Sequence, residues 1–325
     1  MKRKILVIGG TMFAGRLLVE KLCNDNRYDT TLFNRGKTNT NLFPNLSKFH
    51  GNRETDDLSQ ICNQNWDVVV DFCGYYPVTF HNLLNKLSNK VGRYIFISTL
   101  SVFPFNNNDK ALISENDPTL NCSDEQKISI LPDAYGEKKA EMERILLSHP
   151  ELDPIILRPS FIYGRYDWTD RFYYWIFRAY INKTVLLPPT DVLSLTYVDD
   201  LVKGLLNAIE VKEHSKCYNA VSHRQITLNQ ILKTSAELLN KDISIININE
   251  DFLQKNDVNQ SSFPLAIPFA LDAEGEKWFN DLNVIPTAFN ETIEETIKYA
   301  KSLNWPEPKT GLTLSKEIEL IKLNV

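Results

Sequence analysis

The sequence lacks the features of a membrane, secreted or nucleic-acid-binding protein. Its N-terminal apolar run, Ile5–Ile8, stops at Gly9 and is far shorter than a signal-peptide core or a membrane span. The formal net charge of −5 disfavours the basic surface that attracts nucleic acid or an anionic membrane. We therefore expect a soluble protein with neither nucleic acid nor a membrane as a partner.

Cysteine is also scarce. The chain has five cysteines, an odd number, and none of them stands in C-x-x-C spacing, which is typical of reduced thiols in the cytoplasm. The five histidines show no spacing that is typical of metal ligands. A cytoplasmic location and a site without metal are the expectations that follow.

The chain has a composition that can build a large core. Of its 325 residues, 43% are hydrophobic. In the first half, short apolar runs alternate with helical periodicity, and this pattern predicts an α/β fold with a parallel sheet flanked by helices. The predicted strands are Ile5–Ile8, Thr30–Phe33, Lys48–His50, Val68–Asp71, Tyr94–Ser98 and Ile155–Arg158.

Two later regions have a weaker pattern. Residues 106–133 have no apolar periodicity, so we expect a surface loop of the length that usually serves binding. Beyond Gly164 we predict a helix around Phe172–Ile181 and another in the stretch "VDDLVKGLLNAIE", with Asp199 or Asp200 as its N-cap. The mixed tail after residue 225 is interpreted as part of a substrate lobe.

The stretch "GGTMFAG" follows the first predicted strand and begins a helix. In that position a glycine-rich loop is typical of dinucleotide binding: Gly9 makes the tight turn, Gly15 lets the helix pack closely, and the helix N-terminus faces a pyrophosphate. Met12 occupies the place of a middle glycine and is tolerable there if its φ is negative. The predicted cofactor-binding residues of this loop are Gly9, Gly10, Thr11, Met12, Phe13 and Gly15.

The end of the second predicted strand bears on the choice of cofactor. An NAD site usually has a carboxylate there, about 20 residues after the glycines. Here "TLFNRGK" has Asn34, Arg35 and Lys37 instead. Because Arg35 could hold a 2′-phosphate, we predict that NADP is preferred and that NAD is also accepted. A solvated turn without a binding role is the alternative.

The stretch "YGEKK" predicts acid–base catalysis by a tyrosine. Tyr135 and Lys139 stand four residues apart on a predicted helix and therefore share one face. A phenol has an ordinary pKa near 10, so acid–base work near neutral pH needs a cation beside it, which Lys139 can supply. A hydroxyl at the strand end, Thr99, could hold the substrate oxygen. A merely solvated Tyr and Lys is the alternative.

Together these motifs resemble the extended short-chain dehydrogenases/reductases, the NAD-dependent epimerase/dehydratase family. The resemblance rests on "GGTMFAG", "DFCGY", "ISTLSVF", Tyr135-x-x-x-Lys139, "RPSFIYG" and "YVDDL" in that order, and it covers nearly the whole chain. It implies Thr99 and Tyr135 as catalytic residues and Lys139 as a catalytic residue that also binds the ribose. It further implies cofactor contacts at Asn52, Arg53, Phe72, Cys73, Gly74 and Pro159, and a substrate contact at Ser101.

The resemblance also implies a domain organisation. A Rossmann-type, doubly wound parallel sheet is expected in residues 1–164 with 194–225. A smaller, mixed substrate-binding lobe is expected in residues 165–193 with 226–325. Relatives often pair two subunits through helices beside the sheet, so a homodimer is an expectation of the resemblance as well.

Two departures from the family pattern concern the substrate. Sugar-nucleotide members usually have Asn in the "RPSN" segment and Arg before the "VDD" strand, where this chain has Phe161 and the uncharged "VLSLTYV". The nearby "GRYDWTDRFYYW" has Trp168, which could stack on a substrate, and Arg171, which could pair with an anion. The alternative is that Asp170 caps the next helix while its aromatic residues fill the core.

These observations favour an enzyme that transfers a hydride between nicotinamide and a carbonyl or secondary alcohol of a small molecule, with Tyr135 as the acid–base. A nucleotide-sugar epimerase or dehydratase, in which the hydride returns to the same molecule, is the alternative. An RNA-associated protein with a similar glycine loop is a weaker alternative, since the relatives of that type lack the Tyr-x-x-x-Lys pair.

Overall fold

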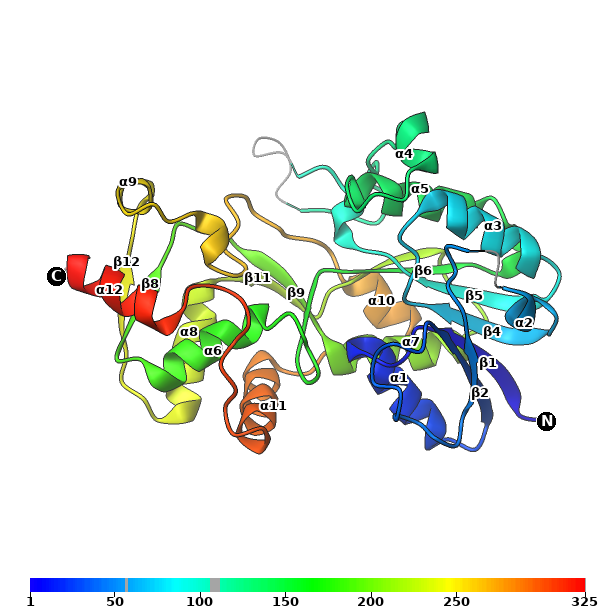
Figure 1. Cartoon of the computed structure of the whole chain (residues 1–325), viewed down its shortest axis with the longest axis horizontal. Helices are drawn as coiled ribbons and strands as arrows, with labels where there is room; N and C mark the ends of the chain where they lie inside the picture. Colours follow the sequence, from blue (N-terminus) through cyan, green and yellow to red (C-terminus); the bar gives the residue numbers. More distant parts are fainter. Residues whose placement is uncertain (56–57, 106–111, 325) are drawn as a thin grey trace.

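The computed structural model describes residues 1–55, 58–105 and 112–324. Within these ranges no helix is both long and apolar enough to cross a membrane. The chain forms one part around a large parallel sheet and another that contains a two-stranded sheet, at opposite ends of the molecule (Figure 1). The N-terminus lies at the large sheet and the C-terminus at the far end of the other part (Figure 1).

The large sheet has seven strands in the order β10-β6-β5-β4-β1-β2-β3, and all of its pairs are parallel. The register places Val7 beside Leu32 on one neighbour and Val70 on the other. The predicted parallel sheet is therefore present. Its strands are β1 (Arg3–Ile8), β2 (Tyr28–Asn34), β3 (Ser47–His50), β4 (Trp66–Asp71), β5 (Val91–Ile97), β6 (Ile155–Pro159) and β10 (Cys217–Ala220).

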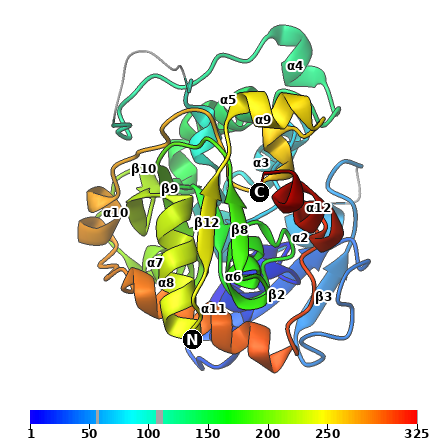
Figure 2. The ribbon, with the colours of Figure 1, turned by 90° about the vertical axis from the view of Figure 1, so that its left-hand side faces the viewer.

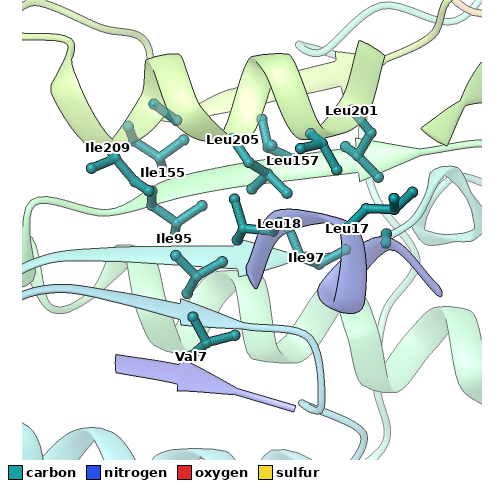
Figure 3. Packing of buried hydrophobic residues seen from close by; sticks show 14 of the residues in the cluster. Val7, Leu17, Leu18, Ile95, Ile97, Ile155, Leu157, Leu201, Leu205 and Ile209 are labelled. Carbon is teal, nitrogen blue, oxygen red and sulfur yellow. The ribbon is translucent and has the colours of Figure 1, made fainter. Parts of the chain in front are cut away.

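Helices cover both faces of this sheet, so the fold is doubly wound. On one face α1 (Phe13–Cys23) and α7 (Val198–Glu210) pack on alternate strand residues such as Val7 and Ile95 (Figure 3). On the other face α3 (Pro77–Leu87) and α5 (Tyr135–Leu147) pack on the residues between them, such as Leu6. The alternation follows from the two-residue period of a strand, and both faces are apolar because both are buried.

The second part has a core of its own. Here α6 (Arg171–Ile181) packs on α8 (Leu228–Leu239), with α11 (Phe289–Ser302) and α12 (Leu314–Asn324) nearby. Figure 2 views this part with its two-stranded sheet, β12 (Ser244–Asn247) and β8 (Thr184–Leu187), in front of α6. We refer to it as the lobe.

A three-stranded sheet stands between the two parts (Figure 1). It consists of β7 (Phe161–Tyr163), β9 (Leu193–Tyr197) and β11 (His223–Ile226). These strands fall at the three boundaries that we predicted near residues 164, 193 and 225, and the division into two domains stays a prediction. The remaining elements are short: α2 (Ser59–Cys62), η1 (Leu100–Val102), α4 (Asp124–Ile128), η2 (Pro150–Leu152), α9 (Glu250–Lys255), η3 (Gln260–Ser262) and α10 (Glu276–Asp281).

The structure differs from two local expectations. The stretch 106–133, expected to be a loop throughout, contains α4, which Ser123 and Gln126 cap at its N-terminus in a reciprocal capping box. Residues 106–111 of that stretch lie outside the described residues. Helix α7 begins earlier than predicted: Tyr197 is its N-cap, and Asp199 and Asp200 stand in its first turn, where acidic residues favour the helix dipole.

Candidate active site

The glycine loop joins β1 to α1 in a conformation that needs its glycines. Gly9 and Gly10 have φ of 104° and 86°, in the region that side chains disfavour. A Cβ on Gly15 would stand 3.0 Å from the backbone N of Gly10, so the helix approaches the loop as closely as a glycine allows. Backbone N–H groups at the start of α1 are therefore left open to a phosphate.

Met12 fits this loop without backbone strain. Its φ is −135°, which meets the condition stated above that φ at this position be negative. Met12 is the N-cap of α1, its side chain makes no capping hydrogen bond, and the residue is 40% exposed. The next residue, Phe13, takes the positive φ of 41° instead. The Met12 side chain has no donor, so at this position only the backbone N–H can donate to a phosphate.

The residues beside the loop include a buried ion pair. Arg53 Nη1 donates to both carboxylate oxygens of Asp71 at 2.8 Å, and the Tyr94 hydroxyl donates to the same carboxylate at 2.7 Å. Arg53 Nε and Nη2 are buried with no hydrogen-bond partner among the described residues. Unpaired buried donors beside a glycine cradle fit a ligand rich in acceptors, such as a dinucleotide. Phe72, Cys73 and Gly74 follow Asp71 at this edge.

The turn after β2 has its cations in solvent. Asn34 Oδ1 accepts a hydrogen bond from the backbone N of Gly36 at 2.8 Å, which shapes the turn. Arg35 and Lys37 are exposed, and Asn52 is half-buried at the neighbouring strand end. The preference for NADP over NAD that this turn suggested stays a prediction.

Tyr135 and Lys139 lie at the start of α5, beside the end of β5. The N-cap residue Ala134 has φ 47°, a left-handed turn that sets the direction in which Tyr135 enters the helix. Thr99 lies two residues after the end of β5 and is the N-cap of η1, and its Oγ1 accepts a hydrogen bond from the backbone N of Ser101 at 3.1 Å. A hydrogen bond also joins the Thr99 and Tyr135 side chains. The structure thus brings the three predicted catalytic residues together.

The charges of these groups depend on burial. Lys139 is 2% exposed, and burial lowers its pKa to about 8, although the Asp71 carboxylate opposes the shift. Its Nζ donates to the backbone O of Ile97 at 2.7 Å. Burial raises the pKa of Tyr135 above its ordinary value, and the Thr99 hydrogen bond and the charge of Arg171 oppose this rise. Lys139 Nζ stands 6.0 Å from the centroid of the Tyr135 ring, so the role that the sequence suggested for Lys139 stays a prediction, and Arg171 adds a second positive charge beside the phenol.

A cavity of about 420 Å³ is lined by all three predicted catalytic residues and by part of the predicted cofactor and substrate sites. Its outer wall is apolar and includes Phe105 and Phe269, whose rings stack with centroids 5.4 Å apart. Phe269 comes from far along the chain, and no sequence motif pointed to it. Of the predicted residues, the cavity is lined by Phe13, Phe72, Thr99, Ser101, Tyr135, Lys139, Pro159, Phe161 and Arg171.

Arg171 is the predicted anion-binding residue of this cavity. Its Nε donates to Thr169 Oγ1 at 3.2 Å, and its Cζ stands 5.0 Å from the centroid of the Phe161 ring. Burial lowers its pKa, although Asp167 and Tyr135 oppose the shift. Asp170 stands at the N-cap of α6 with φ 56°, but its side chain makes no capping hydrogen bond. A partly dehydrated guanidinium beside the reactive phenol can bind a carboxylate or phosphate strongly.

Trp168 lies elsewhere. It is 59% exposed and lines a second cavity of about 500 Å³, together with Met12, Arg16 and Tyr166. The turn at residues 167–171 forms part of both walls, with Trp168 on one side and Arg171 on the other. Trp168 and Tyr135 therefore line different cavities, and a substrate-stacking role for Trp168 stays a prediction.

A family model identifies the segment that contains these residues. Residues 79–221, which include Thr99, Tyr135, Lys139 and Phe161, match the model of the NAD dependent epimerase/dehydratase family. Over this segment the chain is similar to that family, and the match bears out the resemblance that the sequence indicated. The comparison with curated proteins gave no match.

Solved structures confirm the Rossmann-type fold. UDP-glucuronic acid 4-epimerase from Bacillus cereus, in complex with NAD, has a TM-score of 0.70 at 20% identity, covering 92% of this chain and 99% of that one. For dTDP-glucose 4,6-dehydratase from Bacillus anthracis, with NAD, the values are 0.72 and 18%, with 94% and 99% covered. UDP-glucose 4-epimerase from Thermotoga maritima has a TM-score of 0.71 at 20% identity, with 93% and 99% covered.

Proposed function

We propose that this chain catalyses an NAD-dependent epimerase or dehydratase reaction, in which a hydride leaves a secondary alcohol and returns to the same molecule. The observation that carries the proposal is one cavity lined by Thr99, Tyr135, Lys139 and Arg171 in a family segment of this type. The family match favours this alternative over net transfer of a hydride between two molecules.

The residues present fit a nicotinamide dinucleotide. The open N–H groups at the start of α1 suit its pyrophosphate, and the unpaired donors of Arg53 stand beside the same edge of the sheet. Lys139 Nζ has one acceptor, Ile97 O, among the described residues and can donate to ribose hydroxyls as well. When bound, the cofactor supplies a hydride acceptor that is also the donor of the return step.

The protein side chains handle the proton and the orientation. Tyr135, as phenolate, takes the proton of the substrate hydroxyl as the hydride leaves, and it gives the proton back on return. Thr99 donates to the same oxygen and holds it in reach of the phenol. Arg171, beside both, stabilises the phenolate. Lys139, the cation of the Tyr135-x-x-x-Lys139 motif, holds the ribose in place and adds positive charge near the phenol.

A nucleotide-activated sugar is the substrate class to test first. The solved neighbours named above act on UDP-glucuronic acid, dTDP-glucose and UDP-glucose. Arg171 supports an acidic group on the substrate, because its guanidinium shares the cavity with Tyr135 and is not the cation assigned to the ribose. Phe161 stacks on Arg171 where sugar-nucleotide enzymes usually have Asn, so the sugar must be held by other contacts.

The decisive experiment incubates the protein and NAD with each of these three nucleotide sugars. We expect a 4-epimer or a 4-keto-6-deoxy product without accumulation of reduced cofactor, as seen by chromatography and absorbance. The Tyr135→Phe variant should keep its cofactor affinity and lose about 10²–10⁴-fold in turnover. Stoichiometric release of NADH would instead support the net oxidoreductase, and full activity of the variant would contradict the role of Tyr135.

The cofactor preference is a separate proposal. NAD is the cofactor in the solved neighbours, and the family is NAD-dependent. We infer that NADP also binds here, and more tightly, because Arg35 and Lys37 are exposed beside the turn that usually bears a carboxylate. Neither the chemistry of Tyr135 nor its test depends on that preference.

A further inference from the structure

A buried carboxylate stands behind the candidate active site and outside the cavity. Glu143 belongs to α5, four residues after Lys139 and eight after Tyr135, so the three side chains share one face of the helix. Glu143 is 2% exposed. A carboxylate buried to this degree must be paired, because its isolated charge would cost several kcal/mol.

Two neighbours pair with it, one from each adjacent strand. Glu143 Oε1 accepts from the Ser98 hydroxyl at 2.5 Å, and Glu143 Oε2 accepts from Arg158 Nη2 at 2.6 Å. Arg158 Nε adds a further contact at 3.0 Å. Ser98 follows the last residue of β5, and Arg158 belongs to β6. One carboxylate therefore ties the catalytic helix to the ends of two strands.

Both partners of Glu143 lie at the cavity: Ser98 is one of its lining residues, and Arg158 is next to one in the chain. Ser98 precedes Thr99, which hydrogen-bonds with Tyr135, and Arg158 precedes Pro159. The backbone N of Ser98 also donates to the backbone O of Leu157 at 2.7 Å, so the two strand ends are joined directly. A shift of Glu143 would move the strand end that carries Thr99 relative to the helix that carries Tyr135.

Stability alone is a weak reason for such a pair. Replacing a buried ion pair by apolar residues of similar volume is often neutral or stabilising. Directed hydrogen bonds, in contrast to apolar contacts, fix the distance and angle between two segments. In an active site a displacement of about 1 Å can lower the rate about 10²-fold. Hydrogen bonds that fix the position of the strand end relative to the helix therefore have a function that apolar packing does not provide.

We propose that Glu143 is a positioning residue that acts through Ser98 and Arg158 to hold Thr99 in hydrogen-bonding reach of Tyr135. The proposal rests on the role given to Tyr135 above. Its test uses the free protein and no substrate, so an error in the proposed reaction would not affect the result.

The test is the titration of the Tyr135 phenol by carbon-13 NMR of labelled tyrosine, with the signal assigned from the Tyr135→Phe variant. In the double variant Glu143→Met/Arg158→Met the paired charges leave together, so the net charge near the phenol is unchanged. Because the Thr99 hydrogen bond lowers the pKa of Tyr135, loosening it should raise that pKa. We expect a rise on the order of half a pH unit or more, toward the value in Thr99→Ala.

A matched pair in the lobe is the control. Arg178 and Glu317 form an ion pair with side chains 1% and 0% exposed, and Arg178 lies near the end of α6 that is remote from Arg171. Arg178→Met/Glu317→Met should leave the pKa of Tyr135 unchanged. Adding Thr99→Ala to the Glu143/Arg158 variant should cause little further shift, because the two changes act on one contact.

The result that overturns the proposal is an unchanged Tyr135 pKa in a folded Glu143→Met/Arg158→Met protein, or an equal shift in the control. If the double variant fails to fold, Ser98→Ala decides. It removes one hydroxyl and the hydrogen bond of Ser98 to Glu143, and it should raise the pKa of Tyr135 in the same direction by a smaller amount. An unchanged pKa in folded Ser98→Ala would equally overturn the proposal.

Discussion

At the scale of single residues, the candidate site contains buried polar groups whose hydrogen-bonding capacity is only partly used. Lys139 is a buried ammonium with one hydrogen bond, to Ile97 O, among the described residues. Arg53 has two unpaired donors within the same ranges. Such groups lower stability unless a ligand satisfies them, and they cluster where a cofactor is expected.

The charge of Lys139 predicts a pH dependence of stability. Its pKa is about 8 in the folded protein against an ordinary 10.5, so from about pH 8 to 10.5 the unfolded chain binds more protons. The free energy of unfolding of the wild type should therefore rise with pH in this window relative to Lys139→Met. Urea unfolding at pH 7, 9 and 10.5 measures the difference, and a constant difference would contradict the shift. The variant should also bind NAD more weakly.

Arg35 carries the prediction on cofactor choice. If its guanidinium holds a 2′-phosphate, NADP should bind more tightly than NAD by about 1–3 kcal/mol, or roughly 5–150-fold. Arg35→Ala should remove this preference and leave NAD binding nearly unchanged. Arg27→Ala, at the other end of β2, is a control that should alter neither affinity, and Met12→Gly should change both alike. A wild type that prefers NAD would refute the interpretation of Arg35.

At the scale of elements, three helices of the site begin with unusual backbone. Phe13 in α1, Ala134 before α5 and Asp170 before α6 all have positive φ. Each stands at or directly before a residue of the cavity: Phe13 itself, Tyr135 and Arg171. Left-handed backbone costs a residue with a side chain about 1–2 kcal/mol. These turns therefore lower the stability of the fold, and each sets the direction of one side chain of the cavity.

The variant Ala134→Gly tests the energetic cost of the positive φ at this residue. Glycine has no Cβ to oppose φ of 47°, although it also gives the unfolded chain more freedom, so we expect a net gain of up to about 1 kcal/mol in the free energy of unfolding. Ala140→Gly, in the interior of the same helix, should instead lose about 1 kcal/mol or more. Denaturant unfolding of both variants gives the signs, and a destabilised Ala134→Gly would show that the alanine side chain is not strained.

The elements also show what the sequence could predict. All six predicted strands are present. Five of them are buried parallel strands, which leave an apolar run, whereas β3 has no buried residue. Strand β10 was not predicted, since only its place beside β6 makes it part of the sheet. Helix α4 escaped notice because none of its residues is buried and it has no apolar stripe; the spacing of Ser123 and Gln126 was the available signal.

The site followed the same rule. Motifs adjacent in sequence, such as Tyr135 with Lys139, were predictable because a helix fixes their geometry. Trp168 and Arg171 are three residues apart, yet they line different cavities. Asp170, which stands between them, has positive φ and turns the chain just before α6. Long-range partners such as Phe269 leave no local pattern at all.

At the scale of the whole molecule, cofactor binding and folding are linked through the glycine loop. A ligand that binds only the folded chain stabilises it by about 2.7 kcal/mol at a concentration of 100 Kd. NAD should therefore raise the melting temperature of the wild type. The closeness of Gly15 to the backbone of Gly10 makes this stabilisation sensitive to one methyl group.

Substitutions at two glycines distinguish an effect on folding from an effect on cofactor binding. A Cβ at Gly15 would stand 3.0 Å from Gly10 N, inside the loop, whereas a Cβ at Gly92 would stand 2.8 Å from Asp67 O at the start of β5. Both contacts are with backbone, so Gly15→Ala and Gly92→Ala should each lower the melting temperature without ligand. Only Gly15→Ala should also lose the rise on adding NAD, because only its methyl group displaces the N–H groups that face the pyrophosphate. Thermal unfolding with and without NAD measures both effects, and an undiminished rise in Gly15→Ala would mean that the dinucleotide does not bind at this loop.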